Sequence, residues 1–357
     1  MAHRSGTVRA YWGGRAARRG LVARRRVFSG IQPTGKLHLG NYIGAISLWV
    51  ATQADHEAIF CIADLHALTI PEAARAAHLR AKVRETAAVL VACGIDPARA
   101  ILFVQSHVPA HTQLAWLLSC VTPVGWLERM IQFKTRSAGL ESVGTGLLAY
   151  PVLQAADILL YRADLVPVGE DQQQHIELTR DVARRFHTLF GQVFTLPEPM
   201  LQPSGARIMG LDDPSTKMSK SRGETRPRHA IGLVDPPDAI RDAVMHAVTD
   251  SGREVRPERP SPGVTNLLRI YELLSGRRSE AVQLEFMGKG YAVLKRAVAD
   301  LVVTTLEPIR RRYLDIAAEP GRLDAVLDEG AERARPLADA TLDRVNQLMG
   351  LEEGTQD

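Results

Sequence analysis

The stretch that decides the fold is Val27-Phe28-Ser29-Gly30-Ile31, followed by the turn Gln32-Pro33-Thr34-Gly35 and then by His38-Leu39-Gly40-Asn41. The first run is short and mostly apolar, with β-branched and aromatic residues, which predicts a strand that the turn ends. We expect a helix to begin near Gly40. The first N–H groups of a helix have no partner within it, and they lie at the positive end of its dipole. A strand, a tight turn and a helix start therefore predict a site for phosphate groups.

Similar strand-like runs recur along the chain, at Ala58 to Ala63, Ile101 to Gln105 and Leu165 to Val168. Helical stretches separate them, one from Pro71 to Gly94 and another from Asp171 to Phe190. Strands that alternate with helices predict a parallel sheet covered by helices, an α/β fold. Functional side chains in such a sheet gather beyond the carboxyl ends of the strands. They are expected in the Gln32 turn, at Asp64 to His66 and at Gly169 to Asp171.

After about residue 225 the sequence pattern changes to segments with apolar residues at helical spacing, separated by breaks rich in Pro and Gly. Apolar residues recur at helical spacing in Asp238 to Val248, Val264 to Leu274, Gly290 to Tyr313 and Arg322 to Met349. Thr249 to Gly263, with three prolines, is expected to be a loop. We therefore predict three parts: an Arg-rich disordered extension over 1–26, an α/β domain over 27–225 and a helical domain over 226–357.

The composition excludes several classes of protein. No stretch reaches the ~18 consecutive apolar residues of a membrane span, so we expect no membrane insertion. The three cysteines, Cys61, Cys93 and Cys120, are widely spaced. We expect them to be reduced core residues, with no metal site and no disulfide.

The net charge of +4 comes from the N-terminal extension, because residues 1–26 hold eight arginines and no acidic residue. Subtracting those eight positive charges leaves −4 for the rest of the chain. Affinity for nucleic acid must then come from local patches such as Arg310-Arg311-Arg312, which a solvated helix face would equally explain. The leader could be a mitochondrial transit peptide, but it has one Ser and Gly-rich breaks. We favour a disordered extension on a bacterial cytoplasmic protein.

A second motif, Lys217-Met218-Ser219-Lys220-Ser221, lies a domain's length after the first. Taken singly, a helix cap by Asn41 would explain the first motif and a solvated basic loop the second. Together they indicate substitution at the α-phosphate of a nucleotide. His38 can donate to a phosphate oxygen, and lysine ammonium groups stabilise the charge that grows on departing pyrophosphate. We therefore predict His38, Lys217 and Lys220 as the catalytic residues.

These motifs resemble the HIGH-type and KMSKS-type signatures of the class I aminoacyl-tRNA synthetases, and the first departs only at Asn41. Within that class the resemblance narrows to the tryptophanyl-tRNA synthetases and covers nearly all of residues 27–350. Phe28 to Gly35, Tyr150 to Leu159 and Val166 to His175 carry it. It implies an aminoacyl-tRNA ligase with a Rossmann-like, doubly wound parallel sheet and an all-helical C-terminal domain that recognises the anticodon.

The resemblance also implies an ATP site. Its residues would be Gln32, Pro33, Thr34, Gly40, Asn41, Gly169, Glu170, Asp171, Ile208, Lys217, Met218, Ser219, Lys220 and Ser221. Gly40 has no side chain, so adenine or ribose can approach the backbone closely. Glu170 and Asp171 are expected to face the ribose hydroxyls, because two carboxylates would repel a triphosphate. Mg²⁺ is expected to come with ATP, held mainly by phosphates and water, since no dedicated protein cage is visible.

A tryptophan pocket needs an acceptor in an apolar surround, because indole offers one N–H donor and no acceptor. Asp157, within the apolar run Leu153 to Leu160, fits this need, although a structural salt bridge or cap would also explain it. A buried carboxylate also disfavours phenylalanine, which would leave it unpaired. The resemblance adds Phe28, His66, Gln132, Tyr150, Gln154, Val166, Val168 and Gln172, which could equally be ordinary core residues. Gln154 stands where many relatives have Met, and Arg136 where Lys is common, so the pocket wall is altered.

The implied reaction has two steps. The carboxylate of L-tryptophan attacks the α-phosphate of ATP, and the 3′ end of tRNA(Trp) then takes the acyl group. A carboxylate is already a nucleophile at pH 7, so positioning and charge stabilisation carry the catalysis. The resemblance further implies a homodimer, with Trp116 to Met130 as a candidate contact that a buried core helix would equally explain.

Three other functions stay open. A tyrosyl-tRNA synthetase shares the general plan, but its counterpart of the Gly169 to His175 segment ends in Asn where this chain has His175. A nucleotidyltransferase can use a similar first motif but usually lacks the second and the long helical tail. A paralogue that binds tRNA or tryptophan as a regulator would not need His38, Lys217 and Lys220.

Overall fold

The computed structural model describes residues 24–70, 76–139, 141–169, 172–201, 207–256, 258 and 260–351. The predicted extension over 1–26 lies outside the described residues except at its last three positions. Contacts divide the chain into two compact units. Unit 1 contains residues 36–44 and 207–312, and unit 2 contains residues 24–35, 45–201 and 313–351. The units are interleaved in sequence, so they do not follow the predicted boundary after residue 225.

Unit 2 is built on a five-stranded parallel sheet. Its strands are β1 (Arg26–Ile31), β2 (Glu57–Ile62), β3 (Ala100–Val104), β4 (Leu165–Val168) and β5 (Glu198–Leu201). The first four match the predicted runs to within a residue or so. The sequence did not predict β5, because this edge strand is short, half-exposed and interrupted by Pro199.

The strand order β3-β2-β1-β4-β5 confirms a doubly wound Rossmann-like sheet. The order reverses between β1 and β4, which pair in parallel through Val27 and Leu165. Ligands in open α/β sheets bind beyond the carboxyl ends of the strands at such a reversal. Gln32 to Thr34 directly follow β1 and Gly169 directly follows β4, so these predicted residues lie at that point of unit 2.

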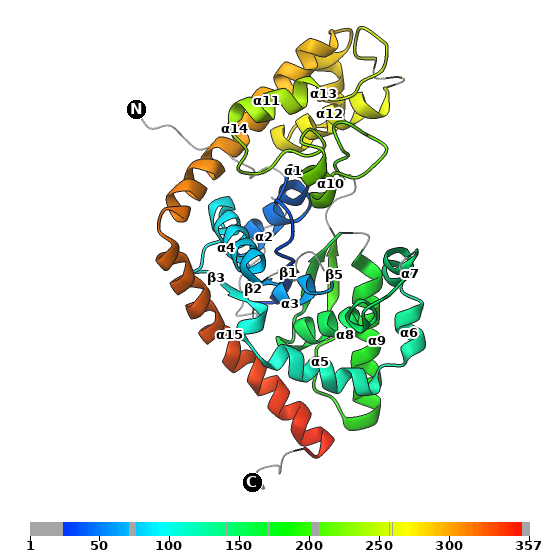
Figure 1. Ribbon diagram of the computed structural model, residues 1–357, viewed down its shortest axis with the longest axis vertical. Helices are drawn as coiled ribbons and strands as arrows, with labels where there is room; N and C mark the ends of the chain where they lie inside the picture. Colours follow the sequence, from blue (N-terminus) through cyan, green and yellow to red (C-terminus); the bar gives the residue numbers. More distant parts are fainter. Residues whose placement is uncertain are drawn as a thin grey trace, which may run out of the picture. The chain divides into compact units, whose positions relative to one another are not determined.

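Helices cover both faces of the sheet (Figure 1). The longer helices of unit 2 are α4 (Ala76–Cys93), α5 (Ala110–Val121), α8 (Thr145–Leu160) and α9 (Gln173–Phe190). Short elements complete it: α2 (Ser47–Thr52), α3 (Asp64–Ala67), a 3₁₀ turn (Gln105–His107), α6 (Val124–Glu128) and α7 (Ile131–Ser137). On one face Phe28, Cys61 and Phe103 form a core with α5, α8 and α9. Trp49 stacks on Phe60, whose side chain points to the other face.

Unit 1 contains the helices after residue 207. They are α10 (Lys220–Thr225), α11 (Pro237–Met245), α12 (Pro262–Ser275), α13 (Ser279–Phe286) and most of α14 (Tyr291–Ala317). Helix α12 starts as such helices should: Ser261 caps it, Pro262 follows, and Gly276 ends it in the left-handed conformation at φ 67°. Unit 1 also holds α1 (Leu39–Asn41), which continues into a π-helical turn (Tyr42–Ile46).

The last helix, α15 (Pro320–Met349), packs against the sheet of unit 2 (Figure 1). Its buried face is made of small residues, including Ala331, Ala334 and Ala338. Gly330 lies so close to β3 that an added Cβ would be 1.9 Å from the carbonyl oxygen of Leu102. The guanidinium of Arg333 donates to the carbonyl of Pro97 at 2.6 Å. Helix α15 is therefore part of the sheet unit, and not of the helical domain in which its period alone placed it.

Two expectations from composition concern membrane-spanning helices and cysteines. No described helix is long and apolar enough to cross a membrane. All three cysteines are thiols, but only Cys61 and Cys93 are buried. The prediction that Cys120 is a core residue was wrong, because it lies on the outer face of α5.

The contact at Gly330 gives a test of the fold. We expect Gly330→Ala to lower the free energy of unfolding by about 1–3 kcal/mol, because the new Cβ would overlap the β3 backbone. Gly321→Ala, in the same helix with open space around it, is the control and should leave stability unchanged or slightly higher. Urea unfolding followed by circular dichroism measures both. Equal stability of the two variants would contradict the close packing of α15.

Candidate functional site

The centre of the candidate site in unit 2 is the carboxylate of Asp157 on α8, which is 4% exposed. Oδ2 accepts from Nε2 of His66 at 2.7 Å. Oδ1 accepts from Nε2 of Gln105 at 2.7 Å and from Nδ1 of His111 at 2.6 Å. The donors come from α3, from the turn after β3 and from the first turn of α5. Three chain segments therefore converge on one buried charge at the carboxyl edge of the sheet.

This surround keeps Asp157 ionised. Burial alone would raise the pKa of Asp157. The electrostatic attraction and hydrogen bonds of His66 and His111 lower this pKa by more than burial raises it, so the net pKa lies well below its usual range. Asp157 is therefore an acceptor only. The same charge acts on its neighbours: burial, Cys61 and Asp157 together raise the pKa of Tyr161, so that this hydroxyl keeps its proton.

Several other predicted tryptophan-pocket residues lie around this centre. Phe28 is 3% exposed and stacks on Tyr161 with ring centroids 5.3 Å apart. The rings of His66 and Tyr150 are nearly perpendicular, with centroids 6.3 Å apart. Val166 in β4 is 3% exposed and belongs to the core that includes Phe28, and Val168 packs against that core. The structure thus brings Phe28, His66, Tyr150 and Asp157 into one connected group.

Tyr150 links this group to the residue that separates the chain from the tyrosyl pattern. Its hydroxyl shares a hydrogen bond of 2.8 Å with Nε2 of His175, a buried residue of α9. The guanidinium of Arg136 lies 5.9 Å from the centre of the Tyr150 ring. Burial raises the pKa of Tyr150, and the charge of Arg136 opposes this in part. His175 thus has a defined place beside the predicted pocket.

The remaining pocket residues, Gln132, Gln154 and Gln172, are half-buried. Gln154 shares α8 with Asp157 and lies three residues before it, about one turn of the helix away. The backbone N–H of Gln172 donates to the carbonyl of Gly169 at 3.0 Å, which turns the chain from β4 into α9. Gln132 lies on the short helix α7.

The predicted ATP residues are divided between the units. In unit 2, Pro33 is buried and Gln32 and Thr34 are half-buried; the N–H of Thr34 donates to the carbonyl of Gln32 at 2.9 Å. Gly169 is exposed after β4. Glu170 and Asp171 lie outside the described residues, so their expected orientation toward ribose stays a prediction.

In unit 1 the first motif is held as a short antiparallel pair. The N–H of Leu39 donates to the carbonyl of Ile231 at 2.8 Å, and the N–H of Leu233 donates to Leu37 at 2.9 Å. The side chain of Asn41 accepts from the backbone N–H of His38 at 3.1 Å, which fixes the helix start expected there. His38 itself is 4% exposed.

The missing side chain at Gly40 makes room for His38. An added Cβ at Gly40 would lie 3.1 Å from the imidazole atoms Cε1 and Nδ1, and 3.7 Å from Cβ of Met218. Gly40 therefore packs the first motif against the second within unit 1, which is a role beyond the predicted approach of adenine. That approach stays a prediction.

In the second motif the side chain of Met218 is buried and that of Lys217 is exposed. Met218 is 2% exposed, and its N–H donates to the carbonyl of Ile208 at 3.0 Å. Lys217 is exposed, while its backbone pairs with Met209. Ser219 precedes α10, in which only the backbone of Lys220 and Ser221 is described. Burial of Met218 thus anchors a loop that presents Lys217 outward.

A buried histidine outside both motifs also holds this loop. His229 is fully buried; its Nδ1 pairs with Oδ1 of Asp212 at 2.6 Å, and its Nε2 lies 3.4 Å from the carbonyl of Lys217. A Cβ on Gly210 would be 2.3 Å from the His229 ring, so only glycine fits there. Sequence reasoning missed His229, because it lies in a polar stretch typical of a loop.

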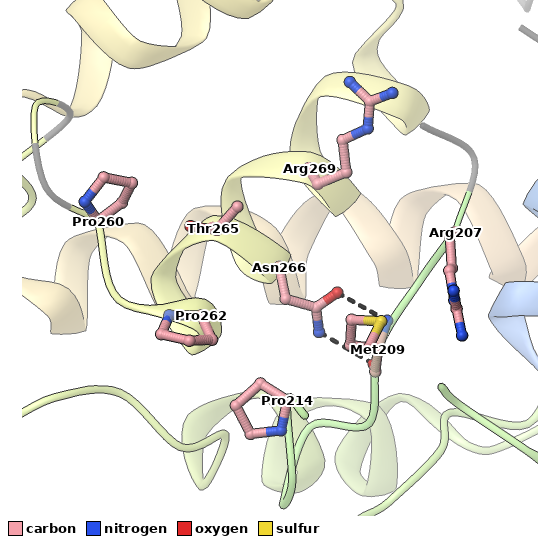
Figure 2. A pocket seen from close by; sticks show the side chains of 8 residues that line it. All are labelled: Arg207, Met209, Pro214, Pro260, Pro262, Thr265, Asn266 and Arg269. Carbon is pink, nitrogen blue, oxygen red and sulfur yellow. Dashed lines mark hydrogen bonds between the residues drawn. The ribbon is translucent and has the colours of Figure 1, made fainter. Parts of the chain in front are cut away.

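Asn266 of α12 holds the strand-like segment that leads into the second motif (Figure 2). Its Oδ1 accepts from the N–H of Met209 at 2.9 Å, and its Nδ2 donates to the carbonyl of Met209 at 3.0 Å. The side-chain amide therefore replaces a neighbouring β-strand. The pocket drawn in Figure 2 is lined by Arg207, Met209, Pro214, Pro260, Pro262, Thr265, Asn266 and Arg269, none of which is a predicted site residue.

Sequence reasoning also missed Gln105, His111 and Tyr161 in unit 2. Gln105 ends a predicted strand, and His111 and Tyr161 flank apolar helical runs, so each resembles an ordinary boundary residue. A signal was present: Gln105 and His111 follow a strand at the carboxyl edge of a parallel sheet, where functional groups gather.

Comparison with known proteins shows the family of this chain. The family model described as tRNA synthetases class I (W and Y) matches residues 23–307. The chain belongs to the class I tRNA synthetases. The tryptophan–tRNA ligase of Gloeobacter violaceus is 52% identical over 331 residues, which cover 92% of this chain and 97% of that protein. The resemblance predicted from the two motifs is thereby confirmed.

Two solved structures have the same fold as this class I synthetase. The tryptophanyl-tRNA synthetase of Mycoplasma pneumoniae is 34% identical, with a TM-score of 0.83 over 92% of this chain and 98% of that one. That of Campylobacter jejuni, complexed with ADP and tryptophan, is 34% identical, with a TM-score of 0.78 over 91% of this chain and 99% of that one.

Asn266 gives a test of how the second motif is held. We expect Asn266→Ala to lower the free energy of unfolding by about 1–3 kcal/mol, because two backbone groups of Met209 lose their partner. It should also speed tryptic cleavage after Lys217. The neighbouring exposed Thr265, whose hydroxyl donates to the carbonyl of the cap residue Ser261 at 2.9 Å, is the control; Thr265→Ala should stay within about 0.5 kcal/mol. Unchanged cleavage in Asn266→Ala would show that Asn266 does not hold the loop.

Proposed function

We propose that this class I synthetase is a tryptophan–tRNA ligase that activates L-tryptophan with ATP and transfers it to tRNA(Trp). The observation that carries the proposal is the buried Asp157 carboxylate, held as an acceptor beside Phe28, His66 and Tyr150. It is the group that an indole N–H needs. Relatives named tryptophan–tRNA ligase, about half identical over nearly the whole chain, support it.

The pocket explains selectivity without a separate editing site. A ring without an N–H donor would cover Asp157 and leave an ionised group short of a partner, which costs far more than a missing methylene. Tyrosine would instead bring a hydroxyl to a pocket whose Tyr150 hydroxyl is already bonded to His175. Residues that line the ring in this proposal are Phe28, His66, Gln132, Tyr150, Gln154, Val166, Val168 and Gln172, with Asp157 as the N–H acceptor.

In the first step, the tryptophan carboxylate attacks the α-phosphate, a P–O bond to the pyrophosphate breaks, and tryptophanyl-adenylate forms. The carboxylate needs no base, so the protein binds, orients and neutralises charge. His38, Lys217 and Lys220 supply donors for the phosphate oxygens as negative charge moves to the leaving pyrophosphate. The burial of Met218 and the contacts of His229 and Asn266 support this role, because they order the loop that carries the lysines.

ATP enters as its magnesium complex in this proposal. Among the described residues, no group of three or more His, Cys, Asp or Glu side chains could hold a metal ion. We propose that the triphosphate and water provide most Mg²⁺ ligands, as is usual for this ion. Unit 2 provides Gln32, Pro33, Thr34 and Gly169 for the nucleotide, with Glu170 and Asp171 at the ribose.

For tRNA we propose that the helices of unit 1 recognise the anticodon, and for the cell that the protein acts in the cytoplasm. We also propose a homodimer. Three large apolar side chains on successive helices support it: Trp116 on α5, Val124 on α6 and Ile131 on α7 are 70%, 58% and 66% exposed. Large apolar side chains exposed on helices that follow one another in the chain make this segment a candidate interface.

The reaction is tested by tryptophan-dependent exchange of labelled pyrophosphate into ATP with Mg²⁺. We expect exchange with tryptophan, none with tyrosine or phenylalanine, and loss of exchange when EDTA removes the metal. Asp157→Ala should raise KM for tryptophan at least about 100-fold and KM for ATP less than about threefold. Asp181→Ala is the control, because Asp181 is an exposed carboxylate paired with Arg184. Exchange with tyrosine, or equal loss of both substrates, would refute the assignment.

The homodimer has its own test. Trp116→Glu should convert a dimer into a monomer, because a charge would replace an apolar contact. Leu284→Glu, which alters an equally exposed apolar residue on α13 of unit 1, should leave the dimer intact. Analytical ultracentrifugation measures both masses. A dimeric Trp116→Glu protein would place the interface elsewhere.

A further inference from the structure

The two carboxylate oxygens of Asp157 accept different numbers of hydrogen bonds from the described residues. A carboxylate oxygen has two lone pairs. Oδ1 accepts from both Gln105 and His111, whereas Oδ2 accepts only from His66 among the described residues. Oδ1 is therefore saturated, and Oδ2 keeps one lone pair.

Each donor to Oδ1 is fixed by a second contact. The Oε1 atom of Gln105 accepts the backbone N–H of Leu65 at 3.2 Å, so the amide is oriented with its NH₂ group toward Asp157. The Nε2 atom of His111 shares a hydrogen bond of 2.8 Å with the hydroxyl of Tyr161, while its Nδ1 donates to the carboxylate of Asp157, which can only accept. Gln105, His111 and Tyr161 are all fully buried. These groups thus form a rigid polar cluster within unit 2.

The same cluster touches the wall of the predicted pocket. The Tyr161 ring, whose hydroxyl orients His111, stacks on Phe28 with an angle of 10° between the ring planes. Phe103 packs against both His111 and Tyr161, with centroids 5.7 Å and 5.8 Å away. Aromatic packing therefore fixes the ring of His111, and hydrogen bonds fix the direction of its N–H.

We propose that Gln105 and His111 are positioning residues that occupy Oδ1 of Asp157, so that Oδ2 alone is presented to the ring N–H of the amino-acid substrate. This inference rests on the proposed function, in which Asp157 accepts that N–H. Neither Gln105 nor His111 needs to touch the substrate. They set the rotation of the carboxylate and thereby make the pocket selective for a bicyclic ring that carries a donor.

The chemistry of the cluster supports a role in selectivity. An apolar packing of this volume would be the less demanding way to support α8, because each buried polar group must be satisfied. A carboxylate held by His66 alone could rotate about its Cβ–Cγ bond and accept a donor in several directions. With two further donors on Oδ1, one rotation remains, and a ring with sulfur or carbon in place of N–H leaves the remaining lone pair of Oδ2 unmet.

The test compares two amino acids of nearly the same shape. L-Tryptophan and L-3-(benzothiophen-3-yl)alanine differ in the N–H that sulfur replaces. We expect kcat/KM of pyrophosphate exchange in the wild type to favour tryptophan by about 100-fold or more. Gln105→Met and His111→Phe keep the shape of each side chain but remove its donor to Oδ1. Each should reduce kcat/KM for tryptophan at least tenfold and change that for the sulfur analogue less than threefold.

Two further variants guard against simple misfolding. His111→Asn places an amide N–H near the position of Nδ1 and should restore most of the preference for tryptophan. Tyr161→Phe removes only the hydroxyl that orients His111, keeps the stack on Phe28, and should reduce the preference by a smaller factor than His111→Phe. Melting temperatures identify variants that fold.

The outcomes separate this inference from the proposed function. If wild-type protein shows no tryptophan-dependent exchange, the proposed function fails. If the wild type is active and the folded variants lose kcat/KM equally for tryptophan and for the sulfur analogue, Gln105 and His111 only support the fold and the inference is overturned. A preference for tryptophan that stays at the wild-type level in the variants overturns it as well.

Discussion

A buried negative charge is the constraint on which the sheet unit depends. Asp157 lies on α8 beneath the carboxyl edge of the sheet, where an unpaired carboxylate would be very costly. Its donors come from α3, from the turn after β3 and from the first turn of α5, so the carboxylate fixes the positions of these three segments around it. The aromatic rings of Phe28, Phe103 and Tyr161 close around them. Packing and electrostatics thus require the same arrangement, and the site is the result.

The loops of unit 1 cannot be held mainly by apolar packing, since they carry charge and little apolar surface. They are held by polar side chains that stand in for secondary structure. Asn266 pairs with the backbone of Met209 as a strand would, and His229 spans from Asp212 to the backbone of Lys217. Gly210 and Gly40 leave the space that the rings of His229 and His38 fill. In this way Lys217 stays exposed next to the buried Met218.

Prediction from sequence succeeded where periodicity is local. The apolar runs of β1 to β4 and the helical periods of α9, α11, α12 and α14 specify their own structure, because the signal lies within one element. Strand β5 was missed because an edge strand with Pro199 lacks that signal. Helix α15 was recognised as a helix but assigned to the wrong unit. Its stripe of Gly330 and alanines shows that another element packs closely against it, but the stripe does not identify that element as the sheet. Cys120 was misplaced for a similar reason: an apolar helix does not show which face it buries.

By itself the sequence determined the class of fold, the two motifs and the family, and it predicted Asp157 as an acceptor, because each of these signals lies within short runs of residues. Only the tertiary structure decided which side chains hold that acceptor. Gln105 and Asp157 are 52 residues apart, and Asn266 and Met209 are 57 apart. Contacts of that range leave no periodic trace in a single sequence. They arise only when the parallel sheet brings the carboxyl ends of its strands together, or when a helix packs beside a loop.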